Sequence, residues 1–192
     1  MLMKLFAITL LLISNFAFTQ VTIVIHEKTG YEGKEDFADR SAKILAEVIN
    51  SEKFKAAILN GTFTEKNELT NQQVYDLIMQ AHELNGPGGT DKVIDLRVRT
   101  MSAQVDGKKW MRWCRPGSAV RTIGKDGGGT GIVATCPQHL TIWANRNDVA
   151  RLAGHYAHEY MHILGFSHLK KKSTSLVYKV GNIVEQLIRN GF

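Results

Sequence analysis

A glutamate lies between two histidines that are four residues apart, in the order His158-Glu159-Tyr160-Met161-His162. Apolar residues recur at helical spacing from Val149 to Leu164, which predicts a helix over this segment. Four residues of a helix correspond to about 400° of rotation, so the two imidazoles lie about 40° apart and roughly 6 Å along the axis. Both can therefore reach one metal ion. Glu159 is about 100° round from His158, where its carboxylate can take a proton from a water molecule beside that ion.

His168 is the candidate for a third ligand to the same ion. A catalytic zinc ion takes three protein ligands and keeps a fourth position open for water. A continuous helix would carry His168 about 15 Å beyond His158, which is too far for both to bind one ion. The chain must turn between them, and Gly165 is the residue there that most easily adopts a positive φ. The sequence thus predicts that the helix ends at this glycine and that His168 folds back.

The complete pattern, H-E-x-x-H-x-x-G-x-x-H, resembles the signature of the metzincin clan of zinc endopeptidases. The resemblance implies a Zn²⁺ cofactor held by His158, His162 and His168, with Glu159 as the catalytic base. It also implies an α+β, zincin-like domain with a twisted mixed sheet, an active-site helix that ends at a glycine, and a short C-terminal helix. A protein or peptide substrate would bind in extended form along an edge strand, for which residues 131–135 are the candidate.

The metzincin resemblance extends, with one difference, to the turn that lies beneath the metal in that clan. No methionine follows His168, and Leu176 occupies the methionine position in the segment Thr174-Ser175-Leu176-Val177-Tyr178. Leucine can form a similar apolar floor, because exchanges between leucine and methionine are usually mild in a core. Tyr178 resembles a tyrosine that stabilises the oxyanion in some members, and a buried turn tyrosine is an equally good interpretation.

Two other functions are compatible with the same residues. The chain could be a zinc-bearing binding or inhibitory protein with little turnover, or a hydrolase of a non-protein envelope polymer. The presence of Glu159 favours an enzyme, because a site that only binds metal needs no base there. His155 lies about 10 Å along the helix axis from His162, which favours a packed or cleft-edge histidine over a fourth ligand.

Several further elements must position these residues. Asn147 and Asp148 are a plausible start for the metal-site helix. Further helices are predicted at 36–59, at 70–84, where Thr70 to Gln73 form a capping-box pattern, and at 181–190. β-Branched and aromatic runs predict strands at 21–25, 93–100, 110–113, 119–123, 131–135 and 140–143.

The first 19 residues have the layout of a secretory signal peptide, with Lys4 before an apolar run that is too short to span a membrane. We therefore expect residues 20–192 to form a single catalytic domain that is secreted or periplasmic, with no stable membrane span after cleavage.

The chain contains two cysteines, Cys114 and Cys136. An oxidising compartment and an even count favour a disulfide between them over free thiols or a metal role. The formal net charge of the chain is +6. The basic residues are scattered along the sequence, and no nucleic-acid-binding motif accompanies them. We therefore expect no nucleic-acid partner.

Overall fold

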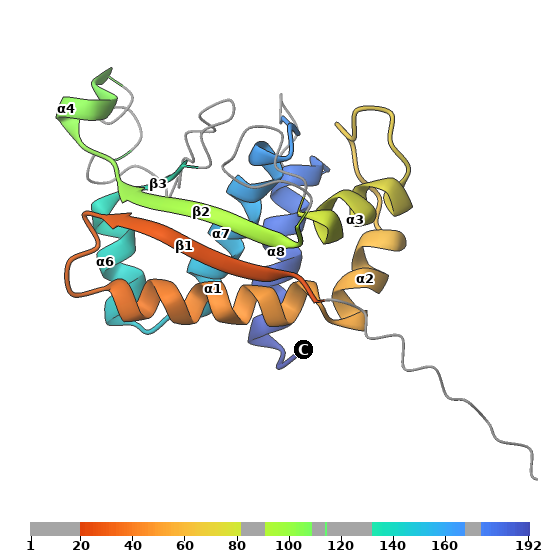
Figure 1. The fold of residues 1–192 in the computed structure, drawn as a ribbon, viewed down its shortest axis with the longest axis horizontal. Coiled ribbons are helices and arrows are strands. Elements are labelled where there is room, and N and C mark those ends of the chain that lie inside the picture. The colour runs from red at the N-terminus through yellow and green to blue at the C-terminus, as the bar shows by residue number, and fades with distance from the viewer. Residues whose placement is uncertain (1–19, 82–90, 109–113, 115–131, 168–173) are drawn as a thin grey trace, which may run out of the picture.

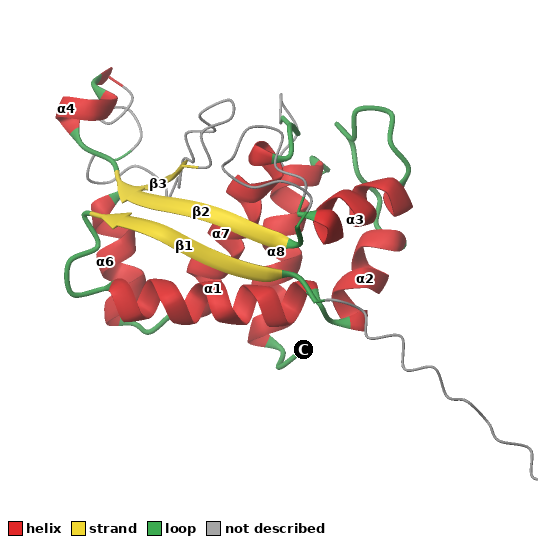
Figure 2. Ribbon diagram, in the orientation of Figure 1, coloured by secondary structure: helices red, strands yellow, loops and turns green. Residues whose placement is uncertain are grey.

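A three-stranded sheet and the helices packed on it form the described part of the protein. The structure is a computed structural model, and it describes residues 20–81, 91–108, 114, 132–167 and 174–192. The strands are β1 (Thr22–Thr29), β2 (Val93–Thr100) and β3 (Ile132–Thr135), in the order β1-β2-β3. Both pairs are parallel, with Ile23 opposite Ile94 and Val98 opposite Val133. Figures 1 and 2 show this arrangement.

The described sheet agrees with the α+β prediction and differs from it in one respect. It contains parallel pairs where a mixed sheet was expected, and the predicted strands at 110–113 and 119–123 lie outside the described residues. Predicted strands 21–25, 93–100 and 131–135 correspond to β1, β2 and β3. In β2, Ile94, Leu96 and Val98 are buried, as expected for alternate residues that face a core.

The connection from β1 to β2 contains helices, which is the usual form of a crossover between parallel strands. It contains α1 (Glu35–Ile49), α2 (Glu52–Leu59) and α3 (Asn71–Gln80). The predicted segment 36–59 is two abutting helices, and the Ser51 hydroxyl caps the second by accepting from the amide of Phe54. The capping box of Thr70 and Gln73 is confirmed. The predicted helix end at Leu84 is wrong, because Ala81 adopts a left-handed conformation with φ 50° and ends α3.

The prediction of a strand at 140–143 is also wrong, because these residues lie in the helix α6 (Pro137–Asn145). Proline at the first helical position has a φ suited to helix formation. Leu140 and Trp143 are three residues apart and both buried, so they share the inner side of this helix. A four-residue apolar run does not distinguish the two structures by itself. The short helix α4 (Ala103–Asp106) was not predicted.

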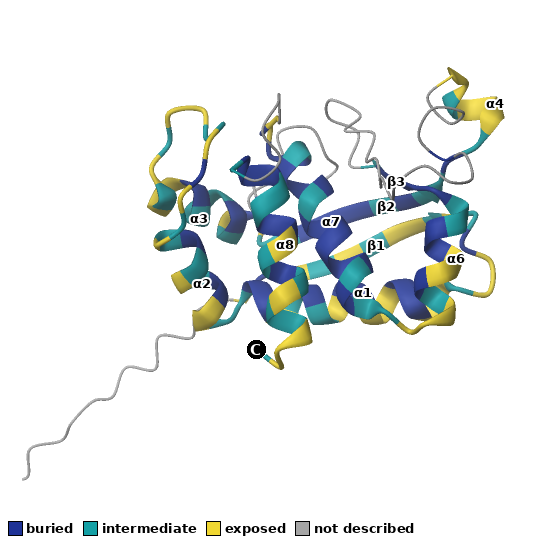
Figure 3. Ribbon diagram, turned by 180° about the vertical axis from the view of Figure 1, so that it is seen from behind, coloured by how far each residue is buried: buried dark blue, intermediate teal, exposed yellow. Residues whose placement is uncertain are grey.

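The two C-terminal helices, α7 (Val149–Ile163) and α8 (Leu176–Arg189), pack side by side and lie on the same side of the sheet (Figures 1 and 3). The predicted start of α7 is confirmed, because the Asp148 carboxylate caps the helix by accepting from the amide of Arg151. Most of α7 is buried, as Figure 3 shows, since it packs against α1 as well as α8. α8 begins at Leu176, before the predicted start at Gly181.

Two further predictions can be compared with the described residues. A disulfide joins Cys114 to Cys136, with 5.4 Å between the Cα atoms, which confirms the predicted pairing. Among the described residues, no helix is long and apolar enough to cross a membrane. Residues 1–19, the predicted signal peptide, lie outside the described part.

Candidate metal centre

Three side chains of α7 converge close to its C-terminal end. One ligand atom from each of His158, Glu159 and His162 can be chosen so that all three lie within 4.8 Å of one another. His158 and Glu159 are close neighbours, with 3.8 Å between Nε2 and Oε1. The His158 side chain is 13% exposed and that of Glu159 is 2% exposed. The group is therefore a compact cluster of two imidazoles and a carboxylate that could hold a metal ion.

The orientation of His162 is fixed by the backbone that follows the helix. Its Nδ1 lies 2.8 Å from the carbonyl oxygen of Phe166. A carbonyl can only accept, so Nδ1 is the donor and carries the proton. In the neutral form of such a ring, the lone pair is on Nε2. A backbone carbonyl on the second imidazole nitrogen is the arrangement that orients histidine ligands in metal sites.

The carbonyl of Phe166 is brought into place by the way α7 ends. The amide of Phe166 donates to the carbonyl of Met161 at 3.0 Å, and the amide of Gly165 donates to the carbonyl of His162 at 2.9 Å. These two bonds form a Schellman motif, with Gly165 at its left-handed position and φ 89°. The predicted helix end at this glycine is confirmed. His168, the predicted third ligand, lies outside the described residues.

Tyr178 reaches the metal group from the neighbouring helix α8. Its ring and that of His158 meet edge to face, with 4.7 Å between the centroids. The predicted turn at residues 174–178 is wrong, because the helix already begins at Leu176. Leu176 is fully buried in the main core, where an apolar side chain is needed. Placement in the first turn of α8 is what directs Tyr178 toward His158.

A pair of glycines lets α7 and α8 approach closely beside the metal group. A Cβ atom added to Gly154 would lie 2.8 Å from the carbonyl oxygen of Gly181. One added to Gly181 would lie 2.7 Å from the carbonyl oxygen of Gly154 and 3.1 Å from the Cβ of His158. Any side chain at either position would therefore separate the helices. The close crossing holds His158 and Tyr178 next to each other.

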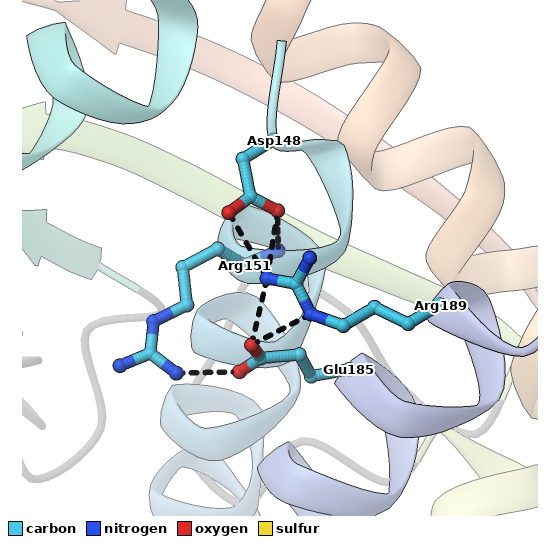
Figure 4. Close-up of polar contacts among 4 residues, drawn as sticks. All are labelled: Asp148, Arg151, Glu185 and Arg189. Atoms are coloured by element: carbon cyan, nitrogen blue, oxygen red, sulfur yellow. Dashed lines mark hydrogen bonds and ion pairs between the residues drawn. The ribbon is translucent and has the colours of Figure 1, made fainter. Parts of the chain in front are cut away.

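Four charged residues join the same two helices away from the metal group (Figure 4). Arg151 of α7 contacts Glu185 of α8 at 2.6 Å. Arg189 contacts both Asp148, at 2.9 Å, and Glu185, at 2.8 Å. Arg189 donates hydrogen bonds to both carboxylates, and these bonds, above all the one to Asp148 and then the one to Glu185, raise the pKa of Arg189. These contacts fix α8 against the N-terminal half of α7.

His155 lies on the buried side of the metal group and is not part of it. Its Nε2 is 3.1 Å from the hydroxyl of Thr135, which is 3.0 Å from the hydroxyl of Tyr31. Its Nδ1 is 3.5 Å from Oε1 of Glu159. Burial, with smaller contributions from the charges of Arg151 and His139, lowers the pKa of His155 to about 3. The packed histidine expected at this position is confirmed, and its ring is neutral at physiological pH.

Thr135 and Tyr31 belong to the surroundings of the site, and no sequence pattern indicated them. Tyr31 and Thr135 are 104 residues apart in the chain. They meet because the parallel sheet places the end of β3 near the loop that follows β1. Single polar residues in a loop and at a strand end have no spacing rule that would reveal such a contact.

None of the protein-family models, curated proteins or solved structures that were searched matches this chain. What the described residues provide is a helix-borne His-Glu-His group with the spacing of H-E-x-x-H, able to hold a metal ion.

Proposed function

We propose that this protein is an exported, zinc-dependent endopeptidase in which Glu159 is the general base. The observation that carries the proposal is the convergence of ligand atoms from His158, Glu159 and His162 within 4.8 Å on one helix. A metal-binding histidine pair with a carboxylate beside it is what hydrolysis by an activated water molecule requires.

The donor set suits zinc. Imidazole nitrogens at the two ends of a helical turn are borderline-soft ligands that bind this ion well. His158 and His162 would hold it, with His168 as the third ligand, and the hydrogen bond from Nδ1 of His162 to Phe166 leaves Nε2 of His162 as the binding atom. The disulfide between Cys114 and Cys136 supports export, because such bonds persist in oxidising compartments.

Bound zinc would supply Lewis-acid chemistry, lowering the pKa of a water molecule and polarising the scissile carbonyl. The residues of the chain then handle the proton. A carboxylate oxygen of Glu159 accepts it from the attacking water and later delivers it to the amine that leaves. The nearly complete burial of Glu159 keeps bulk water away from this transfer.

Tyr178 and β3 have supporting roles in this proposal. The Tyr178 ring lies against that of His158, and its hydroxyl would donate to a carbonyl oxygen that gains negative charge. β3 is the last strand in the described order, so an extended peptide could pair with its other side.

The test is a comparison of Glu159→Gln with the wild type on a peptide library, read by mass spectrometry. The amide keeps the size of the side chain and removes the base. We expect zinc content near that of the wild type and activity lower by at least about 10²-fold, the lower range for general base catalysis. Glu47→Gln is the matched control, because Glu47 is exposed on α1 and should be silent. A wild type that holds zinc and cleaves nothing, or a fully active Glu159→Gln, would contradict the proposal and favour a zinc-bearing binding protein.

A second test concerns the third ligand. Purified mature protein should contain about one zinc ion per chain, and His168→Ala should lose most of it, since two imidazoles hold zinc less tightly than three. Metal analysis measures both values. Full retention of zinc by His168→Ala would remove His168 from the ligand set.

A further inference from the structure

The base of the proposed reaction has a buried histidine one helical turn before it. His155 and Glu159 are four residues apart on α7, so their side chains lie on the same side of the helix. The side chains are 1% and 2% exposed, so both are shielded from water. Within the described ranges, Nδ1 of His155 is a buried atom that makes no hydrogen bond of ordinary geometry, and Oε1 of Glu159 lies 3.5 Å from it.

The other nitrogen of the His155 ring is held by a different part of the fold. Nε2 lies 3.1 Å from the hydroxyl of Thr135, the last residue of β3. That hydroxyl also lies 3.0 Å from the hydroxyl of Tyr31, which is fully buried after β1. The Thr135 hydroxyl on the sheet side, together with the rings of Trp143 and Tyr156, therefore fixes the orientation of the imidazole.

Only two proton arrangements are consistent with this chain of groups around a neutral ring. In one, Tyr31 donates to Thr135, Thr135 donates to Nε2, and the ring proton is on Nδ1. In the other, Nε2 donates to Thr135, and the lone pair of Nδ1 faces the carboxylate of Glu159. The second arrangement places a lone pair against a negatively charged oxygen in a buried site, where such repulsion is strong. The first arrangement is therefore favoured.

We infer that His155 is a positioning residue for Glu159, donating from Nδ1–H to the carboxylate while Thr135 holds Nε2. This inference rests on the proposed function for its catalytic meaning. The donated hydrogen bond would fix the rotamer of Glu159, and with it the position of the carboxylate that accepts the proton. At 3.5 Å the contact is long, and catalytic hydrogen bonds are often long without substrate and shorten when it binds.

The first test does not depend on activity. Nitrogen chemical shifts of the His155 ring in zinc-loaded protein, measured by NMR, identify which nitrogen carries the proton. We expect the proton on Nδ1 in the wild type. A proton on Nε2 would overturn the inference, whether or not the protein proves to be a peptidase.

The second test uses two substitutions of the ring. His155→Phe keeps an aromatic ring between Trp143 and Tyr156 but removes the donor. His155→Asn is smaller, yet its amide nitrogen can lie near the position of Nδ1 and donate. We expect His155→Phe to lower kcat by about 10- to 100-fold with zinc content and KM little changed, as for other residues that orient a site. His155→Asn should recover part of that loss. If packing alone mattered, the smaller Asn would be the worse of the two, and that order would overturn the inference.

A third test changes Thr135, the residue that contacts Nε2 of His155. Thr135→Val keeps the shape of the side chain and removes the donor to Nε2, so kcat should fall while zinc content stays constant. Glu47→Gln is again the control, because Glu47 is exposed on α1 and lies outside this chain of groups. Equal activity of Thr135→Val and the wild type would overturn the inference even if the His155 variants did not fold. Absence of peptidase activity in the wild type would instead remove the proposed function, and the nitrogen shifts would still decide the hydrogen bond.

Discussion

α7 and α8 cross closely at Gly154 and Gly181, and only Gly181 lies against the metal ligand His158. Substitutions at the two glycines can therefore distinguish an effect on stability from an effect on metal binding. In Gly181→Ala, the new methyl group would lie 2.7 Å from the carbonyl oxygen of Gly154 and 3.1 Å from the Cβ of His158. Neither atom is the flexible end of a side chain, so relief requires the helices to move apart. Overpacking of this kind costs up to about 3 kcal/mol.

A smaller favourable effect opposes this cost. Alanine stabilises a helix interior by about 1 kcal/mol relative to glycine. The expected net loss for Gly181→Ala is therefore about 2 kcal/mol, which for a chain of this size lowers Tm by about 4–8 °C. Thermal unfolding followed by circular dichroism measures it.

Gly154→Ala is the matched comparison. Its methyl group would meet the carbonyl oxygen of Gly181 at 2.8 Å and the Cβ of Glu185 at 3.1 Å, and neither of these atoms belongs to the metal group. Both variants should lose similar stability, because each presses a methyl group against a backbone carbonyl. Only Gly181→Ala displaces His158, so we expect its zinc affinity to fall by at least about tenfold, the lower range for changes around a ligand. Competition with a zinc chelator measures the affinity. The reasoning is refuted if Gly181→Ala is as stable as the wild type, or if both variants lose zinc affinity equally.

Three further predictions concern the disulfide, His155 and Leu176. Reduction of the bond between Cys114 and Cys136, which are 22 residues apart, should lower the free energy of unfolding by roughly 3 kcal/mol, measured by denaturation with and without reductant. The pKa of His155 is lowered to about 3, so its ring signals should not titrate by NMR between pH 8 and pH 5. Below pH about 6.5, this histidine binds a proton in the unfolded chain but not in the folded one, so the free energy of unfolding should decrease as the pH falls. That decrease should be smaller in His155→Phe, which lacks the titrating ring. Leu176→Met should change stability by less than about 1.5 kcal/mol in the same denaturation assay, whereas Leu176→Asp, with a buried unpaired carboxylate, should prevent folding or zinc binding.

The helix that bears the metal group was predictable because its signals are local and agree with one another. Apolar residues at helical spacing, the cap at Asp148 and the glycine at 165 each indicated the same boundaries, and the structure has them. The same holds for the capping box at Thr70. The disulfide followed from the count of cysteines and the expected compartment.

Other features depended on contacts that the sequence does not encode locally. Residues 140–143 alone suit a strand, and their helical structure depends on Pro137 before them and on a core that accepts Leu140 and Trp143 together. The start of α8 at Leu176 similarly has no side-chain cap, so no capping pattern predicted it. The support of His155 by Thr135 depends on strand order, which only the folded sheet determines.

The hydrogen bond that orients His162 has a consequence for how the site tolerates mutation. Its acceptor is the main-chain carbonyl of Phe166, which every amino acid possesses. Replacement of the side chain at 166 therefore leaves the acceptor in place, and the orientation of His162 should not depend on which side chain is present at 166. The site should instead be sensitive to substitution of Gly165, because a residue with a Cβ atom is disfavoured by about 1–2 kcal/mol at φ 89°. Random mutagenesis scored by zinc retention should accordingly accept many apolar residues at 166 and few residues other than glycine at 165.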